Sequence, residues 1–229
     1  MGRWLSPDWS AKAEPVPYAK LGDPQSLNLY AYLLNNPLAG VDADGHERVQ
    51  LGQHTDDQIK ARTKEITGQL KDKSLSKGDK AALRAERNTL GLEKQGNAEA
   101  GAYLAALDKV GQRNGLQLSN LVLTTDPTND FSSMNLAGNT IAHIINPNTV
   151  AFVLGNQGPI YLKSDSMFNE ATKGFGFVSA AERNDYGGSV LRHEQDHTAG
   201  GDENSAYNVQ RKVWQFFKKR CSIRTIHEG

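Results

Sequence analysis

Residues 189–207 read SVLRHEQDHTAGGDENSAY and contain two histidines, His193 and His197, that are four positions apart. In an α-helix, residues four apart differ by about 40° around the axis and by about 6 Å along it. Both imidazoles would therefore project from the same helix face, one turn apart. The apolar residues Val190 and Leu191 can anchor such a helix in a core. The stretch predicts a helix that presents a histidine pair.

The glutamate that directly follows the first histidine gives this pair a specific chemistry. Two imidazole nitrogens on one helix face can bind one Zn²⁺ ion at about 2.1 Å. Glu194 is too close in sequence to His193 to bind the same ion comfortably, but it can accept a proton from water held on the metal. Zinc lowers the pKa of that water to about 7, so the pattern predicts metal-dependent hydrolysis at neutral pH. The alternative is an exposed histidine pair on a surface helix.

Two acidic residues compete for the position of third ligand. The glycines at 200–201 predict the end of the helix, and the chain continues into Asp202 and Glu203. We expect Glu203, which lies six residues after His197, to be the third ligand, with Asp202 as the alternative. Glu203 could instead be only a first-turn acid of the last helix, where the helix dipole favours it. Asp196 is expected to point away from the histidine pair.

The arrangement of these residues resembles the zincin superfamily of metallopeptidases. The spacing from the second histidine through a glycine to the next ligand is similar to that of the metzincins, which have His or Asp where this sequence has Glu203. A glutamate that opens a second helix, with Ala206 three residues later, looks more like the glutamate-liganded zincins. The resemblance implies Zn²⁺ as the cofactor, bound by His193, His197 and Glu203, with Glu194 as the general base.

The same resemblance implies an α+β zincin-like fold with a small mixed sheet, spanning residues 117–229. The segments LQLSNLVLTTD (116–126) and TVAFVLGNQGPIYLKS (149–164) have the composition of strands, and the second reads as two strands joined by a turn. NTIAHIINP (139–147) also reads as a strand, with His143 as a core or sheet-face residue rather than a ligand. Either this segment or TVAFVL would be the edge strand that pairs with an extended substrate.

Helical patterns surround the predicted strands. Residues 47–116 form a charged region of helical character, in which Thr55 is an expected N-cap. The glycine-rich residues 174–188 read as a loop that leads into the histidine-bearing helix. This helix is expected to begin at Ser189, or sooner, around Asn184 or Asp185, and in that case to run through the two glycines. In the last segment, 203–220, an apolar stripe predicts a helix packed on the core. Its residues are Ala206, Val209, Val213, Phe216 and Phe217.

The N-terminal segment carries a second resemblance. GRWLSPDW (2–9) and PQSLNLYAYLLNNPLAGVDADGH (24–46) look like the C-terminal end of the core domain of Rhs proteins. The resemblance implies that residues 1–46 are an Rhs-core remnant and that a variable toxin domain follows. Rhs cores form a hollow β-cage around the toxin, and a pair of aspartates releases it by self-cleavage. Asp8 and Asp42 match those aspartates, although both residues can also serve only to form turns.

Bulk composition narrows the expected partners. The chain has 26 basic and 26 acidic residues and a formal net charge of zero, so no long-range attraction to nucleic acid or to an anionic membrane is expected. No apolar run approaches the roughly 20 residues that a membrane helix needs. The N-terminus lacks the basic stretch and apolar core of a secretory signal, and a single cysteine, Cys221, excludes an intramolecular disulfide.

Together, the two resemblances imply a zinc metalloprotease toxin that is delivered into a competing bacterial cell and cleaves a protein there, in the cytoplasm. A cognate immunity protein would block its cleft, and the Rhs cage would enclose the domain in a full-length parent. Two alternatives stay open on the sequence alone. One is a metal-dependent hydrolase that acts on the cell wall or on nucleic acid, and the other is a catalytically silent Rhs tail or adaptor.

Overall fold

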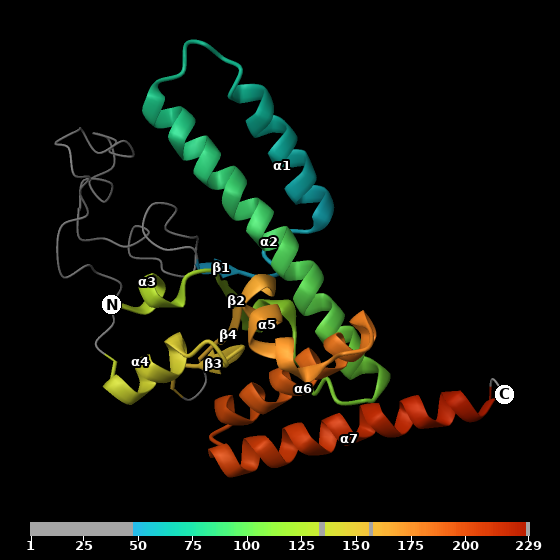
Figure 1. Ribbon diagram of the computed structural model, residues 1–229. Helices are drawn as coiled ribbons and strands as arrows, with labels where there is room; N and C mark the ends of the chain where they lie inside the picture. Colours follow the sequence, from blue (N-terminus) through green and yellow to red (C-terminus); the bar gives the residue numbers. More distant parts are fainter. Residues whose placement is uncertain (1–47, 133–135, 156–157, 228–229) are drawn as a thin grey trace.

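The structure is a computed structural model, and it describes residues 48–132, 136–155 and 158–227 (Figure 1). The segment that resembles the Rhs core, with Asp8 and Asp42, lies outside these residues. Within the described ranges, no helix is both long enough and apolar enough to cross a membrane.

The described chain is α+β, as the sequence predicts, and it is mostly helical with a small mixed sheet. The strands are β1 (Arg48–Gln50), β2 (Leu121–Thr124), β3 (Ala151–Val153) and β4 (Ile160–Lys163). Their order in the sheet is β1-β2-β4-β3, in which β2 and β4 are parallel and the outer pairs are antiparallel. The helices are α1 (Asp56–Gln69), α2 (Lys77–Lys109), α3 (Pro127–Ser132), α4 (Gly138–Ile145), α5 (Asp165–Thr172), α6 (Ala180–Thr198) and α7 (Glu203–His227), with short 3₁₀ turns η3 (Leu118–Asn120) and η4 (Lys173–Phe175).

Side-chain caps fix where the first two helices begin. Thr55 caps α1, as predicted: its hydroxyl accepts a hydrogen bond from the Gln58 backbone N–H, and the Gln58 side chain accepts one from the Thr55 N–H. Ser76 and Asp79 form the same reciprocal pair at the start of α2. Each pair satisfies two backbone N–H groups that a helix start leaves without intrahelical partners. The two helices form a hairpin that projects from the body of the protein (Figure 1).

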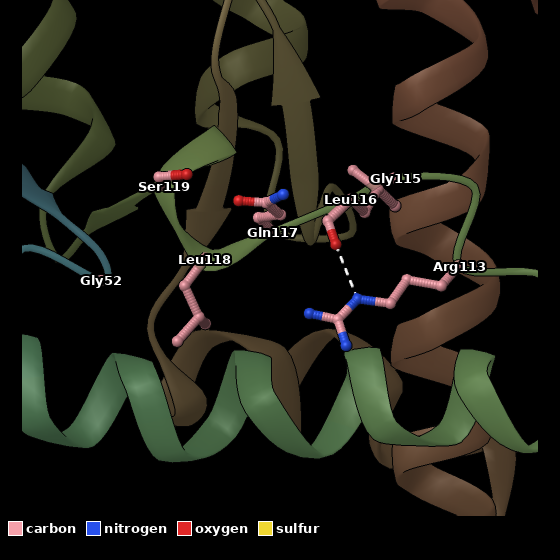
Figure 2. A pocket seen from close by; sticks show the side chains of 7 residues that line it. All are labelled: Gly52, Arg113, Gly115, Leu116, Gln117, Leu118 and Ser119. Atoms are coloured by element: carbon pink, nitrogen blue, oxygen red, sulfur yellow. Dashed lines mark hydrogen bonds between the residues drawn. The ribbon is translucent and has the colours of Figure 1, made fainter. Parts of the chain in front are cut away.

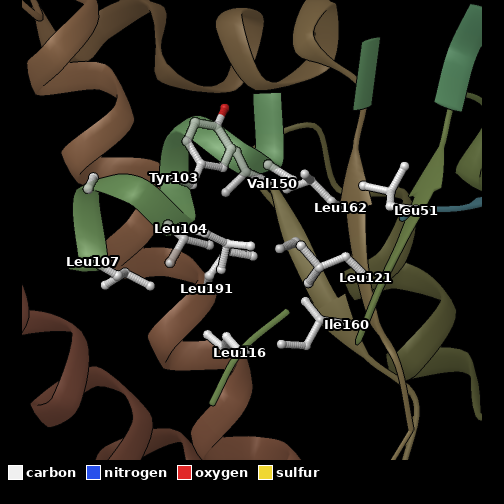
Figure 3. Close-up of a cluster of buried hydrophobic side chains, with 14 of the residues drawn as sticks. Leu51, Tyr103, Leu104, Leu107, Leu116, Leu121, Val150, Ile160, Leu162 and Leu191 are labelled. Atoms are coloured by element: carbon white, nitrogen blue, oxygen red, sulfur yellow. The ribbon is translucent and has the colours of Figure 1, made fainter. Parts of the chain in front are cut away.

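The main core lies between one face of the sheet and the helices α2, α6 and α7. Figure 3 shows Leu104 and Leu107 of α2 and Leu191 of α6 beside Leu121 and Ile160 of the sheet. Each of these side chains is almost fully buried, with an exposed fraction of 2% or less. The helix that carries the histidine pair is therefore held in place by apolar burial, which contributes about 25 cal/mol per Å² of apolar surface.

A second cluster covers the other face of the sheet. It consists of Phe131 of α3, Ile144 of α4 and Phe152 of β3, and Tyr161 of β4 packs against it. Phe131 meets Phe152 edge-on with ring centroids 5.2 Å apart. Because successive side chains on a strand point to opposite faces, the sheet can supply both clusters at once.

The predicted boundary between a helical region at 47–116 and a catalytic domain at 117–229 stays a prediction. In the structure, β1 pairs with β2 across this boundary. Side chains of α2 also share one core cluster with side chains of α6 and α7. The helical region thus contributes directly to the support of the histidine-bearing helix.

Residues 139–147, predicted as a strand, are mostly helical in the structure. They fall largely within α4, where Ile144 is buried and His143 is exposed, so His143 lies neither in the core nor on a sheet face. A short apolar run fits the period of a strand and of a buried helix equally well, and tertiary packing against Phe131 decides between them here.

The loop predicted at 174–188 is wrong from residue 180 onward; the alternative start of the helix, around Asn184 or Asp185, correctly places both glycines in the helix but is about four residues too late. Residues 180–188 form the first half of α6, which begins after Ser179; the Ser179 hydroxyl accepts a hydrogen bond from the Glu182 N–H at 3.1 Å. Glycine at 187 does not mark a turn. It allows α6 to approach α2, because a Cβ added there would lie 2.5 Å from the ring of Tyr103.

The predicted apolar stripe of the last helix is only partly correct. Ala206, Val213 and Phe217 of α7 are buried, but Phe216 is 50% exposed. Adjacent helical residues differ by about 100° around the axis, so positions 216 and 217 cannot both face the core.

Gly187→Ala is expected to destabilise the fold by about 1–3 kcal/mol, the usual cost of overpacking a core. The added Cβ would meet three ring atoms of Tyr103 at 2.5 to 2.7 Å, and the hydroxyl of this ring is tied to Glu99 by a 2.7 Å hydrogen bond. Gly91→Ala on α2 is the matched control. Nothing lies within 4 Å of its added Cβ, so it should stabilise the helix by roughly 0.5–1 kcal/mol. Urea unfolding measures both changes, and a Gly187→Ala chain as stable as the parent would contradict the packing described.

Candidate metal centre

A tight turn between α6 and α7 brings the histidine pair and the following acids together. Gly200 has a φ of +89°, in the left-handed region that favours glycine. Its N–H donates to the His197 carbonyl at 2.9 Å, and the Gly201 N–H donates to the Asp196 carbonyl at 2.9 Å. These two bonds form the Schellman pattern that ends many helices. The predicted end of the helix at 200–201 is confirmed, and α7 runs back along α6 (Figure 1).

Three side chains converge beside this turn. Nε2 of His193 and Nε2 of His197 lie 3.1 Å apart. The Glu203 carboxylate faces both rings, with Oε2 3.6 Å from Nε2 of His193 and Oε1 3.6 Å from Nε2 of His197. Tetrahedral bonds of about 2.1 Å place neighbouring ligand atoms about 3.4 Å apart. The group can therefore hold a metal ion, and it is the one group of His, Cys, Asp and Glu side chains with such spacing in the described part of the chain.

The hydrogen bond made by His197 leaves a lone pair on its Nε2, which faces His193 and Glu203. Its Nδ1 lies 2.9 Å from the carbonyl oxygen of Gly201. A carbonyl oxygen only accepts, so Nδ1 carries the proton and Nε2 of the neutral ring does not. Histidines that bind a metal usually adopt such an arrangement, in which the other ring N–H donates to a carbonyl or carboxylate oxygen. The unprotonated nitrogen and the nearby carboxylate of Glu203 together attract a cation.

His193 is the more buried of the two histidines. Desolvation lowers its pKa, the nearby ring of His197 lowers it further, and the charge of Glu203 acts in the opposite direction. A lowered pKa keeps the imidazole neutral, which is the form that binds metals. Tyr207 of α7 packs edge-on against this ring, with centroids 4.7 Å apart. The orientation of His193 is thus constrained by its neighbour on α7.

Glu194 lies on the buried side of the centre, and its residue is only 6% exposed. Burial raises the pKa of its carboxyl group to about 8, and the charge of Glu203 contributes in the same direction. A bound cation would favour the ionised form instead. A carboxyl group whose protonation can be shifted near neutral pH has the property that general acid–base catalysis requires.

The centre is accessible from the side of α7. The side chain of Glu203 is 62% exposed and the residue Tyr207 is 63% exposed. His193 and Glu194 are buried behind them. The exposed side of the centre is thus formed by Glu203 and Tyr207 of α7.

The other two acids near the turn have separate roles. Asp202 caps α7: its Oδ1 accepts a hydrogen bond from the Ser205 N–H at 2.8 Å. Asp196 lies against Gly201, close enough that any Cβ on that glycine would collide with its carboxylate. Neither belongs to the group formed by the histidine pair and Glu203. Which acid actually binds a metal stays a prediction, and the geometry favours Glu203.

The sheet presents an edge near the histidine-bearing helix. Within the described residues, β3 pairs with a strand on one side only, which is β4, and it contacts α6. An edge strand offers a row of backbone N–H and C=O groups to another extended chain. Of the two segments predicted to supply such an edge, TVAFVL contains β3, whereas 139–147 is mostly helical.

A separate cavity of about 380 Å³ lies away from this centre (Figure 2). The Nε of Arg113 donates to the Leu116 carbonyl at 2.7 Å, and its Nη1 pairs with Asp108 at 2.7 Å. The guanidinium group is thus already bound by the protein. None of the three converging side chains lines this cavity, so it has no part in the metal chemistry. Its lining residues are Gly52, Arg113, Gly115, Leu116, Gln117, Leu118 and Ser119.

Sequence reasoning missed two α7 residues that lie near the centre, Tyr207 and Gln210. They follow Glu203 by four and seven positions, which is the spacing of one helix face. That spacing is the signal that could have identified them.

No match to this chain is found among protein-family models, curated proteins or solved structures. The chemistry of the centre is inferred from the side chains that form it: two imidazoles, an exposed carboxylate beside them and a buried carboxyl group next in sequence.

Proposed function

We propose that this chain is a zinc-dependent metallopeptidase, the toxin of an Rhs protein, which cleaves a protein in a competing cell. One observation carries the proposal: the nitrogens of His193 and His197 and the carboxylate of Glu203 converge at distances of 3.1 and 3.6 Å. Imidazole and carboxylate ligands suit Zn²⁺, and three protein ligands leave a fourth position open, as in catalytic zinc sites. The zincin-like fold is part of the same proposal.

Each side chain of the centre has a distinct role in this function. A bound zinc ion would activate a water molecule and polarise the scissile carbonyl. Glu194 accepts a proton from the attacking water and later donates it to the leaving amine. Its burial supports this role, because the carboxyl group is shielded from bulk solvent and its pKa lies near neutral. Gly201 orients the ring of His197 through its carbonyl oxygen.

The substrate that fits this arrangement best is an extended peptide. β3 is an edge strand that contacts α6, so a peptide could add to the sheet by backbone hydrogen bonds close to the histidine-bearing helix. A net charge of zero gives no general attraction to nucleic acid. Both observations favour a peptide over a nucleic acid as the substrate.

The assignment as a toxin has a different support, the resemblance of residues 1–46 to the end of an Rhs core. It implies delivery into the target cell and an immunity protein that protects the producing cell. We expect this inhibitor to cover the exposed side of the centre, around Glu203 and Tyr207, because that side gives access to the histidine nitrogens.

The proposal can be tested on the full chain with a bacterial lysate. The purified protein is expected to contain one zinc ion and to generate new peptide termini in the lysate. A chelator should abolish these termini, and added zinc should restore them. A chain with His197→Ala is the matched inactive control. If zinc is absent at a stoichiometric level and the chelator changes neither stability nor termini, the metallopeptidase proposal is wrong and a silent tail is favoured.

A further inference from the structure

The seam between α6 and α7 follows a regular antiparallel register. Moving away from the turn, each step of about four residues on α6 is matched by a step of about four on α7. His197 faces Glu203, His193 packs on Tyr207, Tyr186 meets Trp214 with ring centroids 5.6 Å apart, and Glu182 pairs with Lys218. This register places position 210 of α7 between the ring of His193 and the ring of Tyr186.

Gln210 occupies that position, and its side chain lies within hydrogen-bonding reach of both rings. The side chain of Gln210 contacts the Tyr186 hydroxyl, and this contact lowers the pKa of Tyr186. The same side chain contacts the imidazole of His193. A single amide has one donor end and one acceptor end, so it can serve both rings at once.

The ring of His193 needs such a partner. Its Nε2 faces His197 and Glu203. Its Nδ1 is buried, and in the described residues no hydrogen bond of standard geometry reaches this atom. A buried polar atom without a partner costs free energy. The amide of Gln210 is the nearby group that can satisfy it after a small adjustment.

We propose that Gln210 is a positioning residue of the metal centre: its amide oxygen accepts the Nδ1–H of His193 while its amide nitrogen donates to the Tyr186 hydroxyl. This bond keeps the proton of His193 on Nδ1 and directs the lone pair of Nε2 at His197 and Glu203. The inference rests on the proposed function, because it assigns a role toward the metal of the same centre.

Tyr186 makes this arrangement rigid. Its ring is packed among aromatic side chains, with Phe175 5.1 Å, Phe177 5.5 Å and Trp214 5.6 Å away between centroids. A phenol held in this way gives the amide of Gln210 a fixed anchor. The series of contacts from Tyr186 through Gln210 to His193 therefore links the aromatic cluster in the first half of α6 to the metal centre at its end.

The test compares three variants of the full chain at position 210 and nearby. Gln210→Met keeps the length of the side chain but cannot hydrogen-bond the imidazole, and zinc affinity is expected to fall about 10- to 100-fold. Gln210→Glu keeps an acceptor and should hold zinc within a few-fold of the parent. Gln215→Ala, at an exposed position of the same helix, is the control and should leave zinc affinity unchanged. Competition with a chromogenic chelator measures all affinities.

A second readout separates positioning from general stability. With ¹⁵N-labelled histidine, the parent loaded with zinc should show a slowly exchanging Nδ1–H signal for His193, which Gln210→Met should lose. Melting temperatures of the metal-free chains should stay close together. If Gln210→Met binds zinc as tightly as the parent and keeps the signal, the role of Gln210 is refuted while the proposed function stands. If the parent binds no zinc, both fail.

Discussion

Glu194→Gln is expected to bind zinc as tightly as the parent chain and to cleave peptide bonds about 10²- to 10⁴-fold more slowly. The side chain is buried beside the histidine pair and is not one of the three converging ligands. An amide of the same shape cannot take a proton from water. The measurements are zinc content after purification and the rate at which new peptide termini form in a lysate.

Glu170→Gln is the matched control for this prediction, because Glu170 is an exposed glutamate on α5, away from the centre. It should match the parent in both zinc content and rate. Parent-like cleavage by Glu194→Gln would remove the general-base role. Loss of zinc from Glu194→Gln would instead mean that this carboxylate belongs to the ligand set.

The metal-free chain gives an independent check on the environment of Glu194. Its pKa is about 8 in the folded chain, against an ordinary value of 4.5. The folded state therefore holds this proton more tightly than the unfolded state, and the contribution of the group to stability falls as pH rises from about 4.5 to about 8. Glu194→Gln cannot titrate, so its stability relative to the parent should rise across this window. Chemical unfolding at pH 5 and pH 8, in chelator, measures the difference.

The parts of the site that could be predicted are those that depend on local sequence. The spacing of His193 and His197 places both on one helix face whatever the rest of the fold does. The end of that helix at 200–201 follows from glycine, which readily takes the left-handed backbone conformation seen at Gly200. Thr55 caps α1 because a threonine before acidic residues satisfies backbone N–H groups at a helix start.

The parts that could not be predicted depend on packing between distant segments. Glycine at 187 is a sign of a loop in sequence, but its role is to let α6 approach Tyr103 of α2, more than eighty residues earlier. The segment 139–147 fits a strand and a helix alike, and its contact with Phe131 decides the outcome. Gln210 has no motif at all. Its spacing from Glu203 places it on the same face of α7, but its place beside His193 depends on the register of α6 against α7, which is a property of the folded pair.

Glu203→Ala is expected to weaken zinc binding by more than the roughly 10- to 100-fold that loss of an outer contact costs, because it removes a carboxylate that faces both imidazoles. Asp202→Ala should leave zinc affinity within a few-fold of the parent. Asp202 is instead the N-cap of α7, so its loss should lower stability by about 1 kcal/mol.

The two neighbouring acids therefore differ in kind, and the pair of variants separates metal binding from helix capping. Glu203→Ala should lower zinc affinity more than Asp202→Ala does, whereas Asp202→Ala should lower the stability of the metal-free chain in urea more. His197→Ala is the reference for the loss of a ligand. The reverse order would identify Asp202 as the third ligand. In that case the Asp202 carboxylate, which now accepts the Ser205 N–H through Oδ1, would have to turn toward the two histidines.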